Sequence, residues 1–157
     1  MRQPKLFRGP ATAPLLHPTL VRIGCTIVVA IPGLRLVSEA NTCEHWRTRA
    51  RRTKEQKSMV TMVLRSLIAE PPRPPVDVVI VRVGPGHLDD DNLQGSGKHV
   101  RDAVAKWIGI DDGRESFRCH VEQTSAGRGV YSVTIRITPQ RSSESQLCAQ
   151  WAEVLGR

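Results

Sequence analysis

The chain has 157 residues, of which 39% are hydrophobic and 4% aromatic, enough apolar sequence for one folded domain. Its 23 Lys and Arg residues outnumber 15 Asp and Glu residues, and the formal net charge of +8 favours an anionic partner, most often a nucleic acid. No stretch approaches the ~20 apolar residues of a membrane span, and the N-terminus lacks the apolar segment of a secretory signal. We therefore expect no membrane partner.

Proline and cysteine placement predicts the domain organisation and the cellular location. Residues 1–18 contain four prolines and little periodicity, so we expect a poorly ordered lead-in, followed by a single domain over residues 19–157. The four cysteines form no CxxC pair and no zinc-type spacing. This pattern indicates reduced thiols and a cytoplasmic protein.

The first half of the chain predicts a strand, a long helix and a second strand. Leu20–Ile31 is rich in β-branched residues and ends at Pro32-Gly33. Asn41 has capping-box spacing, and the helix that it begins is expected to run to about Ala69, where a proline-rich segment stops it. Val76–Val83 is an apolar run typical of a buried strand.

The second half predicts a helix, a hairpin and a short final helix. The helix covers about Asn92–Ile108, and the strands Phe117–Gln123 and Val130–Thr138 are expected to pair across a glycine-rich turn. Ser142 or Ser143 is a candidate N-cap for the last helix. The order β-α-β-α-β-β-α predicts an α/β (α+β) sandwich, with helices packed on a mixed sheet.

The first half of the long helix is strongly basic. Six cations accompany a single acid, Glu55, which is more lopsided than helical ion pairing produces. A solvated helix face and a phosphate-contacting face both fit this pattern. The candidate DNA-binding residues are Arg47, Arg49, Arg51, Arg52, Lys54 and Lys57.

Three adjacent aspartates, Asp89, Asp90 and Asp91, follow the second strand. Like charges this close repel, so the cluster favours a bound cation or proton. In an extended segment Asp89 and Asp91 would share one face, and Asp112 could supply a third oxygen from beyond the helix. These three residues are the predicted metal ligands, with Mg²⁺ as the ion and Mn²⁺ as an alternative. A solvated acidic loop that caps the following helix is the competing interpretation.

Such a metal could activate water for phosphodiester cleavage, with a nearby lysine stabilising charge on the phosphate. Four motifs, in this order, resemble the RusA family of Holliday junction resolvases: Asp89-x-Asp91-Asn92-Leu93, Lys98, Asp102-Ala103-Val104 and Asp111-Asp112. The chain also resembles the phage and prophage branch of that family through Asn41, His45 and Trp46.

The resemblance implies a RusA-like fold and a Mg²⁺-dependent endonuclease. It implies a homodimer that cleaves four-way junctions in DNA recombination and repair, inside a bacterial or phage-infected cell. The catalytic residues would then be Asp89, Asp91, Lys98 and Asp112.

One departure from the family pattern keeps other functions open. Gln94 to Gly97 separate Leu93 from Lys98, where the family has a single residue. A helix through this insertion would keep Lys98 on the metal-facing side, whereas a glycine loop would displace it. The alternatives are a junction- or DNA-binding protein without cleavage, and a small enzyme that uses the aspartates to bind a nucleotide sugar.

Overall fold

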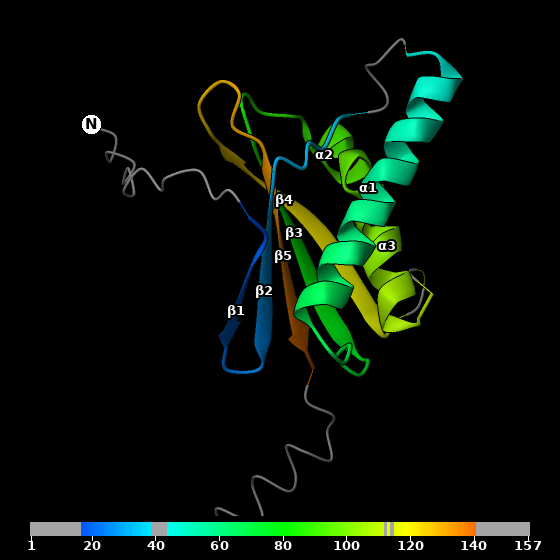
Figure 1. The fold of residues 1–157 in the computed structure, drawn as a ribbon, viewed down its shortest axis with the longest axis vertical. Helices are drawn as coiled ribbons and strands as arrows, with labels where there is room; N and C mark the ends of the chain where they lie inside the picture. The colour runs from blue at the N-terminus through cyan, green and yellow to red at the C-terminus, as the bar shows by residue number, and fades with distance from the viewer. Residues whose placement is uncertain (1–16, 39–43, 112, 114, 141–157) are drawn as a thin grey trace, which may run out of the picture.

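The protein, described here from a computed structural model that covers residues 17–38, 44–111, 113 and 115–140, is a sheet with helices on one face. Figure 1 shows α1 and α3 side by side against the sheet, with the short α2 above α3. The core lies between these helices and the sheet. This arrangement confirms the general α/β class with a mixed sheet. In the described part of the chain no helix is both long and apolar enough to cross a membrane.

The sheet has five strands in the order β1-β2-β5-β3-β4. The pair β3–β4 is parallel and the other three pairs are antiparallel. The strands are β1 (Thr19–Ile23), β2 (Thr26–Pro32), β3 (Val76–Gly84), β4 (Phe117–Ser125) and β5 (Ser132–Pro139). The helix face of the sheet presents the buried alternate residues of β2, β3 and β5.

The predicted first strand, Leu20–Ile31, is in fact an antiparallel hairpin made of β1 and β2. The chain turns at Gly24-Cys25, and Gly24 has φ +59°, a left-handed conformation that glycine adopts without steric penalty. The β-branched residues on both sides of the turn concealed it in the sequence.

The predicted hairpin of β4 with β5 is wrong, because β3 lies between them. The strand β3 is buried at every second residue and half-buried at the others, which is typical of an interior strand. It accordingly has a paired strand along each edge, β5 on one side and β4 on the other. A parallel partner requires a crossover connection, which α2 and α3 supply between β3 and β4.

The helix α1 (Trp46–Leu67) buries its second half against the sheet through Val60, Val63 and Leu64. Its N-cap is His45, whose Nδ1 accepts a hydrogen bond from the Arg47 amide at 3.3 Å. The predicted cap at Asn41 falls outside the described residues, and so does the predicted C-terminal helix beyond Ser142.

The predicted helix Asn92–Ile108 is divided into α2 (Asp90–Ser96) and α3 (Lys98–Ile108) at Gly97. A Cβ at Gly97 would collide with the side chain of Val121 on β4. Only glycine therefore lets the junction of the two helices approach the sheet this closely.

Candidate anion-binding site

The three aspartates begin α2 rather than extending β3. Asp89 is the N-cap, and its Oδ1 accepts a hydrogen bond from the Asn92 amide at 3.0 Å. Asp90 and Asp91 are exposed in the first turn, where the helix dipole favours negative charge. The expectation that Asp89 and Asp91 share a face of an extended segment is therefore wrong, because the backbone is already helical at Asp90.

The predicted metal set is only partly placed. Asp112 falls outside the described residues, and Lys98 is exposed at the first position of α3. Among the described residues, no group of three His, Cys, Asp or Glu side chains is arranged to hold a metal ion. The set Asp89, Asp91 and Asp112 stays a prediction, and so does a catalytic role for Lys98.

Three of the six basic residues on α1 turn toward the rest of the molecule. Lys57 Nζ donates to Asp102 Oδ2 on α3 at 2.8 Å. Arg52 Nη1 donates to Glu44 Oε2, and Arg49 is half-buried. These contacts bind α1 to its neighbours, so this part of the predicted DNA-contact set has a structural role.

The other three basic residues face outward. Arg51 forms an exposed ion pair with Glu55 at 3.4 Å, and Lys54 is exposed. The guanidinium of Arg47 lies 5.2 Å from the ring centre of Trp46. The six residues therefore do not form one continuous phosphate-contacting stripe.

Arg82 is a cation that the sequence analysis counted only as part of an apolar strand. It continues the core-facing row of Val76, Val78 and Ile80 along β3, and only 7% of its surface is exposed. Its Nη1 donates to the carbonyl oxygen of Gly86 at 3.2 Å. Within the described ranges no carboxylate forms an ion pair with it. The sequence did contain a signal for this residue, because Arg82 stands at a core-facing position in the alternating pattern of β3.

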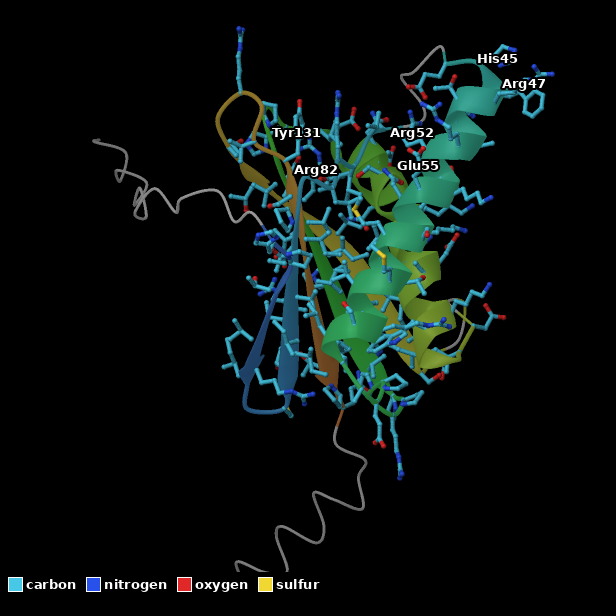
Figure 2. All side chains as sticks on the ribbon, viewed as in Figure 1. His45, Arg47, Arg52, Glu55, Arg82 and Tyr131 are labelled. Carbon is cyan, nitrogen blue, oxygen red and sulfur yellow. The ribbon has the colours of Figure 1, made fainter. Side chains whose placement is uncertain are left out.

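Arg82 lies beside an aromatic ring and a second arginine. Arg82 Nη2 and Tyr131 Cδ1 each lie 3.4 Å from the point that a Cβ on Gly84 would occupy. The guanidinium of Arg35 lies 5.0 Å from the ring centre of Tyr131. Figure 2 shows Arg82 and Tyr131 at the same end of the sheet. We name Arg35, Arg82 and Tyr131 the arginine rim.

A cavity of about 330 Å³ adjoins the arginine rim, between residues 34–37 and α1. Arg35 belongs to both, since its guanidinium covers Tyr131 and it also lines the cavity. The buried Gln56 donates to the Arg35 carbonyl oxygen at 2.7 Å and so fixes this segment against α1. The full lining is Leu34, Arg35, Val37, Glu44, Arg52, Glu55, Gln56 and Met59.

No protein-family model matches the chain, and no curated protein is significantly similar to it. Similar solved structures include the periplasmic domain of MotB (residues 64–256), with 9% identity, a TM-score of 0.44, and coverage of 87% of this chain and 75% of that one. The periplasmic domain of Helicobacter pylori MotB (residues 90–256) has 9% identity, a TM-score of 0.44, and coverage of 87% and 88%. The OmpA-like domain of FopA1 from Francisella tularensis has 12% identity, a TM-score of 0.35, and coverage of 79% and 81%.

These findings correct the assignment to the RusA family, since the similar structures are periplasmic and OmpA-like domains and no family or curated match supports a resolvase. Junction cleavage, endonuclease activity and the branched-DNA partner are withdrawn, together with the homodimer and the non-cleaving alternative that depended on the same assignment. The expected cytoplasmic location is withdrawn as well: the similar structures include periplasmic domains, and that location belongs to those proteins and is not carried to this chain. At these identities and TM-scores, the likeness carries no function to this chain.

The local structure gives physical reasons for these corrections. One carboxylate oxygen of Asp89 accepts the hydrogen bond that caps α2. Lys57 and Arg52 form ion pairs with Asp102 and Glu44 of the same molecule. The aspartate run at the beginning of the motif that resembled a catalytic centre is, in this structure, the start of α2.

Proposed function

We propose that this chain is a binding domain for an anionic ligand, and that the arginine rim recognises the ligand's carboxylate or phosphate group. The buried guanidinium of Arg82 is the observation that carries the proposal. A buried charge that lacks an ionic partner destabilises a fold, because it has lost its hydration. Among the described residues Arg82 has no carboxylate partner, and a bound carboxylate or phosphate could supply one by accepting two parallel hydrogen bonds from the guanidinium.

The surroundings of Arg82 favour an anion that enters from the cavity side. Gly84 leaves open the space that a side chain would fill between Arg82 and Tyr131. Arg35 adds a second positive charge and is held in place by the Tyr131 ring. The ligand's anionic group would bind at the rim, and its remaining atoms would occupy the adjoining cavity, which has the volume of a small-molecule site.

Thermal unfolding in the presence of inorganic phosphate tests this proposal. Phosphate should raise the melting temperature of the wild type, since a ligand that binds only the folded state stabilises it. Arg82→Met should abolish that rise. Arg118→Met is the matched control, because Arg118 is an exposed arginine on the neighbouring strand β4.

The same variant separates a binding role from a structural one. Without phosphate, Arg82→Met should unfold at an equal or higher temperature than the wild type, because it removes a buried charge that has no carboxylate partner among the described residues. If Arg82 served only to hold Gly86 in place, the substitution would lower the melting temperature and leave the phosphate response intact. That result would contradict the proposal.

Divalent-cation binding at Asp89, Asp91 and Asp112 is a separate proposal. Asp90 and Asp91 are exposed, and the second oxygen of Asp89 has no role in capping. Hard oxygen ligands of this kind suit Mg²⁺, which keeps several of its waters. Binding of Mg²⁺, rather than any reaction, is what is proposed.

A further inference from the structure

The outward side of α1 carries a row of exposed cations. At about 100° per residue, Arg47, Arg51, Lys54 and Arg65 fall within about 60° of arc around the helix axis. All four are exposed, and the single acid next to the row is Glu55, which pairs with Arg51. We name this row the outer face of α1. Figure 1 shows the first turns of α1 projecting beyond the sheet.

Large apolar side chains accompany these cations. Trp46, the first residue of α1, is 67% exposed, and the guanidinium of Arg47 lies against its ring. Met62 is 64% exposed and Met59 is 39% exposed, although the other side of the same helix is buried in the core. The described ring contacts of Trp46, with His45 and Arg47, are to exposed residues at the start of α1 and do not bury the indole in the core.

We propose that the outer face of α1 docks on the surface of a membrane that contains anionic phospholipids. Tryptophan rings settle at the headgroup level of a bilayer, where one part of the ring is apolar and the other is wet. Long Arg and Lys side chains reach the headgroups of anionic lipids while their methylene groups stay in apolar contact. The helix would lie along the surface with its cations toward the lipid.

The combination of residues favours a lipid surface over an acidic protein. A specific protein partner usually requires a large complementary patch with few charges at its centre. The outer face is instead a narrow row of exposed cations, and the exposed indole ring of Trp46 contacts the first of them, Arg47. A row of this kind suits a fluid surface of negative headgroups. Docking does not involve the arginine rim, so it is independent of the proposed function.

Co-sedimentation with phosphatidylcholine vesicles, prepared with and without phosphatidylglycerol, tests this inference. The wild type should bind the anionic vesicles at low salt and dissociate as salt is raised. The triple variant Arg47→Gln/Arg51→Gln/Lys54→Gln should bind at least about a hundredfold more weakly, since each cation near such a surface contributes several-fold in affinity. The matched control, Arg22→Gln/Arg118→Gln/Arg128→Gln, removes the same charge from exposed residues outside α1 and should bind like the wild type.

Tryptophan emission gives a second readout at the same site. Binding to anionic vesicles should shift the emission of the wild type to shorter wavelength, and Trp46→Phe should remove most of that shift while remaining folded by circular dichroism. Equal loss of binding in both triple variants would show a general charge effect and overturn the inference. Failure of the wild type to bind anionic vesicles at low salt would also overturn it.

Discussion

Lys57 and Asp102 form a polar link between α1 and α3, with Lys57 Nζ donating to Asp102 Oδ2 at 2.8 Å. Lys57 belongs to the basic half of α1, and Asp102 to a motif that resembled part of a catalytic centre. The two side chains are 41% and 25% exposed. Their contact shows that charges which look functional in the sequence can serve to join two helices.

The first prediction concerns the strength of this link. A double-mutant cycle of Lys57→Ala and Asp102→Ala, measured by urea unfolding, should give a coupling free energy of about 0.2–1 kcal/mol, because water screens a half-exposed pair. Raising the salt concentration should reduce the coupling. A coupling of zero at low salt would show that the pair does not contribute to stability.

The second prediction concerns the core beneath α1. Leu64 is fully buried between the helix and the sheet, so Leu64→Ala should lower the free energy of unfolding by about 2–5 kcal/mol. Met62→Ala, at a position that is 64% exposed on the same helix, should change it by less than about 0.5 kcal/mol. Similar effects from both variants, measured by chemical denaturation, would contradict the orientation of α1.

The third prediction compares two glycines that lie close together in the sequence. Gly97→Ala should destabilise the fold by about 1–3 kcal/mol, because the added Cβ collides with Val121. Gly95→Ala should stabilise it by about 0.5–1 kcal/mol, because the position is helical and nothing lies within 4 Å of the added Cβ. Adding Val121→Ala to Gly97→Ala should recover part of the lost stability, as followed by thermal unfolding.

Elements with a strong hydrophobic pattern could be predicted from the sequence, and their pairing could not. The position of β3 and the buried stripe of α1 follow from residues such as Val78, Val60 and Leu64. The neighbours of each strand depend on contacts distant in the sequence. The strand β5 follows β4 along the chain, yet it pairs with β3 and β2, and this places its inner face in the part of the sheet that contributes to the core.

The candidate sites were harder to predict than the fold. The aspartate run is visible in the sequence, but whether Asp89 caps a helix or extends a strand depends on where α2 begins. Arg82 is recognised as unusual only when it is known which alternate residues of β3 face the core, because Arg82 is one of them. Its proximity to Tyr131 and Arg35 joins three distant segments of the chain, which no local pattern reveals.

The fourth prediction tests the separate proposal of a cation site. Titration calorimetry with Mg²⁺ should show binding to the wild type, and Asp91→Asn should weaken it at least tenfold, because the variant removes one anionic oxygen ligand. Asp77→Asn is the control, since Asp77 lies at the opposite end of β3 from the aspartate run. Absence of binding to the wild type would contradict the proposal.

The central claim is that Arg82 recognises an anion through its planar guanidinium, and a calorimetric titration with inorganic phosphate tests it most directly. We predict that the wild type binds phosphate and that Arg82→Lys, which keeps the charge but loses the two-pronged hydrogen-bonding geometry, binds at least tenfold more weakly. Arg118→Lys should bind like the wild type, because Arg118 is exposed on β4. Equal phosphate affinity in the wild type and Arg82→Lys, or no binding to either, would contradict the claim.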